Sequence, residues 1–399
     1  MPVWHARTKG ARQAGQLQVV GIIQEQHPDR CRLYAQWQQF DWPILHDPIN
    51  AIGARAVPMF VAIDEAGIVV DSVLSLDRLD AFLSRPPATA ESAVGIRPPS
   101  REQLYAQGEA MWDSAAAKKS AEAWMQAGDA LLLWGKPADL DRAWVAYQRG
   151  LELAPDHAPL QFRLGVAHRM RFDLLDDPDA FAQAAAAWNR ALELDPNHYI
   201  YRRRIQQYGP RLMKPYPFYD WIQQARAEIR ARGETPVPLV AEPTGAEVAS
   251  PQTSWTAAPA ARENPDPQGR IDRDGGTLVQ ARVVVVPATI PPGSTTRIHV
   301  ILRPKAGVFW NNEVDPPVVW IDLPAGWEAT EIETSTPVPS QAETREVRSY
   351  DFELKTPPAA TDRTLSGFAL IYICENRGGQ CLFRRIDFEI PLRFVTAEK

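Results

Sequence analysis

Cysteine is scarce in this sequence, and long apolar runs and excess positive charge are missing. Its 399 residues include only three cysteines, too few for the dense disulfide framework of a small secreted domain. No run reaches about 18 apolar residues, so the sequence predicts no membrane span. The net charge of −6 argues against nucleic acid as a partner, because nucleic-acid binding usually needs a basic surface.

Signatures of common catalytic sites are also missing. The sequence has no glycine-rich phosphate loop, no HExxH and no GxSxG motif, so it predicts no cofactor. Clustered histidines and CxxC pairs are absent too, and we expect no metal site. Whether the protein is an enzyme stays open at this stage.

Proline, in contrast, is abundant, and it marks the domain boundaries. The chain has 36 prolines, and they are dense in two stretches, which predict linkers at residues 85–100 and 233–276. Between and beside them lie three expected domains, at residues 1–84, 101–232 and 277–399. A chain of this length and 45% hydrophobic content can bury the cores of about two or three domains.

The first domain alternates strand and helix patterns. Residues 17–23 predict a strand, 29–40 a helix, and 56–69 two strands joined by a tight turn. The strands at 19–23 and 59–63 are apolar at successive positions, so we expect both to be buried on two faces.

A short motif precedes these elements. It reads Trp4-His5-Ala6-Arg7-Thr8-Lys9. With the Val-Pro and hairpin that follow, this segment resembles the thioredoxin-like redoxins, especially the TlpA and peroxiredoxin-like branch, which carry Trp-Cys-X-X-Cys-Lys here. The resemblance implies a partial thioredoxin-like fold. The motif starts at residue 4 without the strand that leads into it, so we expect the true start to lie upstream.

Both motif cysteines are replaced, by His5 and Thr8. Neither side chain can attack or resolve a disulfide, because both steps need a thiolate. We therefore expect a redox-inactive domain that keeps its binding surface. Two alternatives are that His5 serves as an acid, base or metal ligand, and that both residues only begin a helix.

The resemblance also implies a peptide-binding position. In the family the proline equivalent to Pro58 is cis, and the backbone of the preceding residue, here Val57, pairs with an extended peptide.

Polar residues after the first strand form a weaker candidate site. Glu25 and His27 follow the carboxyl end of that strand, where open α/β sheets usually bind ligands. Cys31 lies close behind, at an early helical position between two arginines. It is either a thiol of lowered pKa or a buried structural thiol.

The middle domain contains a repeat. Residues 143–157 and 187–198 match at an offset of 41, which is 198 minus 157. Their "ALELDPN"-type ending resembles tetratricopeptide repeats, which implies an all-α, protein-binding block. Its tryptophans predict interhelical packing.

The last domain alternates apolar and polar residues, as strands do. Six segments predict strands, at residues 279–286, 297–302, 318–323, 347–354, 367–374 and 381–394. They suggest an immunoglobulin-like β-sandwich. Cys374 and Cys381 flank a loop with Asn376 and two glycines, which predicts a hairpin that brings the two sulfurs together.

This segment resembles the N-terminal domain of the DsbD thiol:disulfide interchange proteins. The resemblance implies that Cys374 and Cys381 are a redox pair. A structural disulfide, and free thiols or a metal site, are the alternatives.

These features together predict a multidomain protein with α/β, all-α and all-β parts. We expect a partner-binding protein of a bacterial thiol-redox or envelope system, contributing to cell redox homeostasis through protein or peptide partners. The alternative is a thiol:disulfide oxidoreductase that works through Cys374 and Cys381. The resemblance favours a periplasmic location, although residues 1–20 show no apolar signal segment. The partner and the oligomeric state are not encoded in any recognisable pattern.

Overall fold

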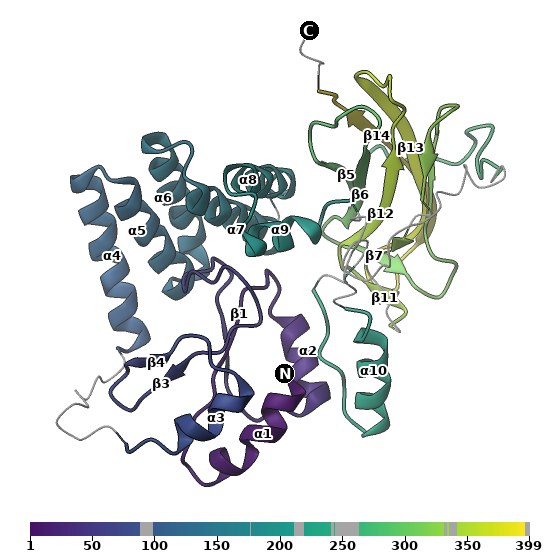
Figure 1. The fold of residues 1–399 in the computed structure, drawn as a ribbon. Helices are drawn as coiled ribbons and strands as arrows, with labels where there is room; N and C mark the ends of the chain where they lie inside the picture. The colour runs from purple at the N-terminus through teal and green to yellow at the C-terminus, as the bar shows by residue number, and fades with distance from the viewer. Residues whose placement is uncertain are drawn as a thin grey trace. The chain divides into compact units, whose positions relative to one another are not determined.

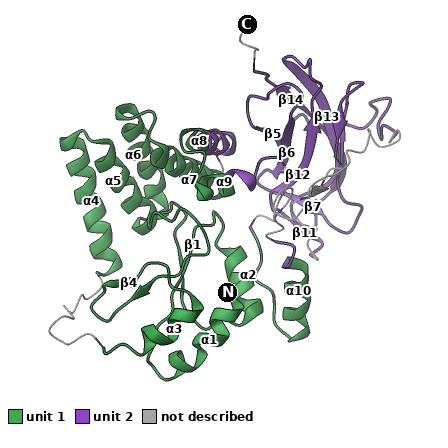
Figure 2. Ribbon diagram, in the orientation of Figure 1, with its two compact units in different colours: residues 1–176, 190–204, 222–239 green, residues 177–189, 205–221, 240–399 purple. Residues whose placement is uncertain are grey.

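The computed structural model describes residues 1–87, 99–175, 177–210, 219–240, 243, 263–330, 333–334 and 341–395. Within these ranges the chain is mixed α/β and multidomain, as expected, and its elements belong to two units (Figures 1 and 2). Unit 1 comprises residues 1–176, 190–204 and 222–239, and unit 2 comprises 177–189, 205–221 and 240–399. No helix in the described ranges is long and apolar enough to cross a membrane.

Unit 1 begins with short strands and helices. Its elements are α1 (Pro2–Gln13), β1 (Gly21–Ile23), α2 (Asp29–Gln38), β2 (Ile44–His46), β3 (Ala62–Ile63), β4 (Val69–Asp71) and α3 (Leu76–Leu83). β1 and β2 pair in parallel through the crossover helix α2, and β3 and β4 form an antiparallel hairpin (Figure 1). The expected helix and hairpin are confirmed.

The core of this region lies on one side of the hairpin. Trp4 of α1 stacks on Phe60 with ring centroids 4.1 Å apart, next to buried Ala62 and Leu79. The expectation that both apolar strands are buried on two faces is wrong, because alternate side chains such as Ile22 and Ile63 are exposed. In the described chain these sheets have only two strands each, so helices cover one face and leave the other open.

The rest of unit 1 is helical. The helices are α4 (Arg101–Lys118), α5 (Ala121–Trp134), α6 (Leu140–Leu153), α7 (Ala158–Leu175) and α10 (Ile222–Ala231), and the unit boundaries divide α8 (Ala180–Leu194) and α9 (Tyr199–Gln206).

Close packing joins α5, α6 and α7. Gly128 of α5 lies against the Tyr147 ring, where an added Cβ would approach a ring carbon to 2.4 Å. The Tyr147 hydroxyl donates to Asp129 (2.9 Å), and Arg163 of α7 donates to the same carboxylate (2.7 Å). A larger residue at position 128 would therefore separate the helices.

The two repeats have the same turn. His157 N–H donates to the Ala154 carbonyl (3.2 Å), and His198, 41 residues later, donates to the Asp195 carbonyl (3.1 Å). Each histidine stands directly before a helix, α7 or α9. The proline in each turn cannot continue the preceding helix, so both repeats reverse at the same place.

The described residues of unit 2 form mainly strands, ten in all. They are β5 (Val279–Val286), β6 (Thr295–Pro304), β7 (Val308–Asn311), β8 (Val318–Ile321), β9 (Glu328–Ala329), β10 (Glu333–Thr334), β11 (Glu343–Thr344), β12 (Arg348–Lys355), β13 (Arg363–Glu375) and β14 (Cys381–Leu392). One sheet has the order β10-β12-β6-β5, with β9 also paired to β12. The other has the order β11-β7-β13-β14, with β8 also paired to β13. All six expected strands are confirmed.

Inward-facing residues of both sheets share one core. Fully buried Trp310 and Ile373 come from one sheet, and Ile298 and Phe352 come from the other. Each such side chain stabilises the fold by roughly 1.5–3 kcal/mol when it leaves water. The core thus explains why strict alternation was visible in the sequence.

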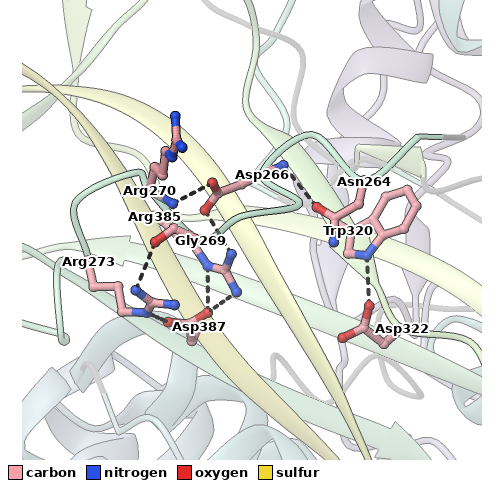
Figure 3. Close-up of polar contacts among 9 residues, drawn as sticks. All are labelled: Asn264, Asp266, Gly269, Arg270, Arg273, Trp320, Asp322, Arg385 and Asp387. Atoms are coloured by element: carbon pink, nitrogen blue, oxygen red, sulfur yellow. Dashed lines mark hydrogen bonds and ion pairs between the residues drawn. The ribbon is translucent and has the colours of Figure 1, made fainter.

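A segment expected to be linker is ordered against the edge of β14. Asp266 accepts from Arg385 (2.8 Å) and from the Arg270 N–H (2.8 Å), and Arg273 pairs with Asp387 (2.9 Å) (Figure 3). Backbone bonds also run from the Asp274 N–H to the Arg385 carbonyl and from the Arg385 N–H to the Asp272 carbonyl. Residues 263–276 therefore cover the outer edge of a long strand, which would otherwise present unpaired backbone groups.

Charged residues are buried on the outer face of the β5–β6–β12 sheet. Arg297 and His299 of β6 both contact Asp351 of β12, at 3.3 and 2.9 Å, and the second ring nitrogen of His299 donates to the Tyr208 carbonyl (2.7 Å). Burial raises the pKa of Asp351, but the attraction of His299 and Arg297 outweighs it, so this pKa lies below its ordinary value.

Asp351→Asn should destabilise unit 2 by about 3–5 kcal/mol at neutral pH, because it removes the buried carboxylate that the Arg297 guanidinium and the His299 ring both contact. Since the pKa of Asp351 is lowered by folding, its contribution is present above the ordinary aspartate pKa of about 4 and is lost as pH falls below it. Calorimetry from pH 7 to pH 2 should therefore show that the difference in free energy of unfolding between wild type and variant becomes smaller as the pH falls. Asp315→Asn, at an exposed position, is the control. A difference in unfolding free energy that stays constant with pH would contradict the lowered pKa of Asp351.

Candidate functional site

The two C-terminal cysteines lie opposite each other at the end of a hairpin. Cys374 and Cys381 are partners in the β13–β14 register, their Cα atoms are 3.9 Å apart, and a disulfide joins them. The expected proximity is confirmed. Asn376 (φ 61°) and Gly378 (φ 70°) make the turn, and the Glu375 N–H closes it on the Gln380 carbonyl (2.9 Å).

The two sulfurs differ in accessibility. Cys374 is buried, whereas Cys381 is exposed. An incoming thiolate must approach one sulfur along the S–S axis, so Cys381 is the one open to attack. Cys374 would then be the leaving group.

A carboxylate from another strand completes this site. Glu343 of β11 accepts the Gly378 N–H with both oxygens at 3.1 Å. One of its oxygens lies within 4.8 Å of both cysteine sulfurs. Nothing in the sequence indicated Glu343, because it lies in a two-residue strand whose pairing with β7 is not visible from local pattern.

Two arginines lie beside the strand position opposite Cys374. Arg345 and Arg377 lie over the ring of Phe309, at 5.5 and 5.7 Å from its centroid. Phe309 is the β7 residue opposite Cys374. Positive charge near a cysteine favours its thiolate, whereas the nearby Glu343 carboxylate opposes it.

The Trp4–Lys9 motif lies on α1 and takes part in packing. Thr8 is buried and donates to the Trp4 carbonyl (2.7 Å). His5 contacts Asp41 (3.0 Å), which Arg12 also binds, and Lys9 is exposed. Burial raises the pKa of Asp41, but hydrogen bonds from Arg12 and His5 outweigh it and lower this pKa.

These contacts give His5 and Thr8 roles in packing and hydrogen bonding of α1. Neither His5 nor Thr8 supplies a thiol. In the described ranges, no group of three or more histidine, cysteine or carboxylate ligands forms around His5. The motif residues instead attach α1 to the strands and to the aromatic residues Phe40 and Trp42.

An apolar stripe follows the expected peptide-binding position. The Val57–Pro58 bond is cis, as expected. Four apolar side chains from this point onward are exposed, with values of 47% for Val57, 47% for Met59, 40% for Val61 and 54% for Ile63, and from Met59 to Ile63 they alternate with the less exposed Phe60 and Ala62. We call these four residues the stripe. Alternation of this kind means that an extended backbone presents one row of apolar side chains to solvent.

The weaker polar candidate is used for packing. His27 is buried, and burial together with Arg169, Arg30 and Arg204 lowers its pKa well below the ordinary value. Arg204 donates to the Gln26 side chain (2.6 Å) and to the Gln24 carbonyl. The Glu25 carbonyl accepts from His46 (2.7 Å). Side chains of unit 1 therefore occupy the space around residues 24–27.

Comparisons with known proteins give no family. No family model matches the chain, and no curated protein matches it. One similar solved structure is titled "AvmM Catalyzes Macrocyclization in Alchivemycin A Biosynthesis", with 11% identity over 31% of this chain and 91% of that chain, and a TM-score of 0.18. Another is the alkylpurine DNA glycosylase AlkC of Pseudomonas fluorescens bound to abasic-site DNA, with 11% identity, 80% and 90% coverage, and a TM-score of 0.13. At these scores neither similarity supports an argument about fold or function.

Cys31 should be an unreactive thiol. Burial, and next the nearby Glu25, raise its pKa to about 11. At pH 8 its thiolate fraction is thus roughly 100-fold below that of an ordinary cysteine. Alkylation by iodoacetamide, followed by mass spectrometry, should be at least about 10-fold slower in the folded protein than in urea. Equal rates in the two conditions would contradict the burial of this thiol.

Proposed function

We propose that this protein is a partner-binding protein of a bacterial thiol-redox or envelope system. In this proposal residues 1–84 form a redox-inactive thioredoxin-like domain, residues 101–232 a tetratricopeptide-like block, and residues 277–399 a DsbD-like, immunoglobulin-type sandwich. The observation that carries the proposal is the stripe.

The stripe suits an extended peptide. Among the described strands β3 pairs only with β4, so its other edge has backbone groups available to a new strand. Strand addition gains affinity from main-chain hydrogen bonds and selectivity from alternate side chains. The expected ligand is therefore an extended segment of a partner protein with apolar residues at every second position.

The helical block supports the same function. Its two turns repeat with equivalent hydrogen bonds, as stacked helical repeats do. Such blocks commonly bind other proteins, and residues 101–176, 190–204 and 222–232 of this block belong to the same unit as the stripe.

Val61→Asp should weaken peptide binding by about 10-fold or more, because contact with a valine of this kind is worth roughly 1.5–3 kcal/mol. The probe is a fluorescent ten-residue peptide of alternating valine and threonine, and the measurement is anisotropy with the full chain. Val3→Asp, at an exposed apolar position outside the stripe, is the control.

A second peptide distinguishes strand addition from nonspecific hydrophobic binding. It keeps the valines and replaces the threonines by proline, which removes backbone donors. Binding of this peptide as tight as that of the first, or an unchanged affinity of Val61→Asp, would overturn the proposal.

Thiol:disulfide interchange is the second candidate function, and the exposed sulfur of Cys381 favours it. A thiolate of a partner dithiol would attack the Cys381 sulfur, the S–S bond would break, and Cys374 would leave as a thiolate and take up a proton. The partner's second thiolate would then attack the partner's own sulfur and release Cys381. The partner is oxidised and this pair is reduced.

The reduction potential tests that candidate. A shuttling pair should equilibrate with glutathione at about −200 to −260 mV. Titration of Cys31→Ser, followed by mass spectrometry of trapped thiols, measures this pair alone. A potential below about −300 mV would leave a structural disulfide and exclude the shuttle.

A further inference from the structure

The surroundings of the disulfide contain a third potential metal ligand. The Glu343 carboxylate and the sulfurs of Cys374 and Cys381 lie within 4.8 Å of one another. Within the described ranges this is the group of three His, Cys, Asp or Glu side chains with ligand atoms close enough to hold an ion. The three residues come from β11, β13 and β14, so the fold rather than local sequence assembles the group.

The spacing suits a tetrahedral ion once the disulfide opens. Two thiolates bound to Zn²⁺ at about 2.3 Å are roughly 3.8 Å apart in tetrahedral geometry. Cysteines opposite each other in a hairpin, with Cα atoms 3.9 Å apart, can reach that separation by side-chain rotation. A carboxylate oxygen within 4.8 Å needs only a small further approach.

Glu343 is also held in place for this role. Gly378 donates its N–H to both carboxylate oxygens, which fixes the orientation of the group. Each carboxylate oxygen has a second lone pair, so one of them can still coordinate an ion. A hydrogen bond to a ligating carboxylate is the usual outer-shell support of a metal site.

We propose that the reduced form of this hairpin binds one thiophilic divalent cation, such as Zn²⁺, through Cys374, Cys381 and Glu343. A dithiol reductant first opens the disulfide and is itself oxidised to a disulfide. The two thiols then lose their protons to water as the metal–sulfur bonds form. A water molecule completes the four ligands on the exposed side of Cys381. The bound metal protects the thiols from reoxidation.

Charge in the site favours a cation. Two thiolates and one carboxylate carry three negative charges, against the two positive charges of Arg345 and Arg377. Thiolates select soft or borderline metals over Mg²⁺ and Ca²⁺. The site does not depend on peptide binding at the stripe, and it requires only that the disulfide can be opened chemically.

The test uses the full-length Cys31→Ser variant. The protein is reduced with a phosphine, and the phosphine is then removed under an oxygen-free atmosphere. Titration with Cd²⁺, followed by thiolate-to-metal charge-transfer absorbance and competed with Zn²⁺, should give one ion per chain. The oxidised protein should give none. Glu343→Gln should weaken binding at least 10-fold. Glu375→Gln, which removes a carboxylate beside Cys374 on the other face of the strand, should bind as wild type.

X-ray absorption of the Zn²⁺-loaded protein gives a second readout that needs no variant. It should show two sulfur and two oxygen ligands. Three results would each overturn the proposal. They are a metal bound by four sulfurs at half an ion per chain, metal binding by the oxidised protein, and an affinity of Glu343→Gln equal to that of the wild type. A further expected result is that Zn²⁺ slows reoxidation of the pair by a disulfide oxidant at least 10-fold.

Discussion

The register of β13 and β14 is the constraint on which the disulfide site depends. Twelve consecutive pairs run from Arg363↔Leu392 to Cys374↔Cys381. A slip of one residue would turn the inward-facing side chains of a strand to the opposite face, so the core fixes the register. Gly367 reinforces it, because a Cβ there would lie 2.5 Å from the Phe388 ring opposite. The two cysteines lie opposite each other because all the other residue pairs of the β13–β14 ladder keep the same register.

The same ladder explains how much of the site could be read from sequence. Alternation gave the strands, and Asn376 with its glycines gave the turn, so the meeting of the two sulfurs was predictable. Glu343 was not, because it lies 31 residues before Cys374 and reaches the hairpin through the short β7–β11 pairing. Local pattern carries information about neighbours on one hairpin, but none about a two-residue strand from another part of the sheet.

In unit 1 the sequence predicted the helix and the hairpin better than it predicted which of their residues are buried. The helix and the hairpin are where periodicity placed them, yet the strands expected to be buried expose every second side chain. The loop expected to bind ligand is instead filled by Arg204, which lies 178 residues from Gln26. Burial is decided by what packs against an element, and those partners came from distant helices. For the same reason residues 263–276, polar and proline-rich, are ordered by the edge of β14.

The stripe and the disulfide constrain the protein in physically different ways. The disulfide closes its hairpin covalently, so its effect does not depend on any concentration. The stripe leaves apolar surface in water, and each valine-sized side chain there forgoes roughly 1.5–3 kcal/mol of burial. A bound segment restores that stabilisation only in proportion to its occupancy, as RT ln(1 + [L]/Kd). In the proposed function, the region around β3 would therefore gain stability when a partner segment binds, whereas the hairpin of unit 2 would respond to redox conditions.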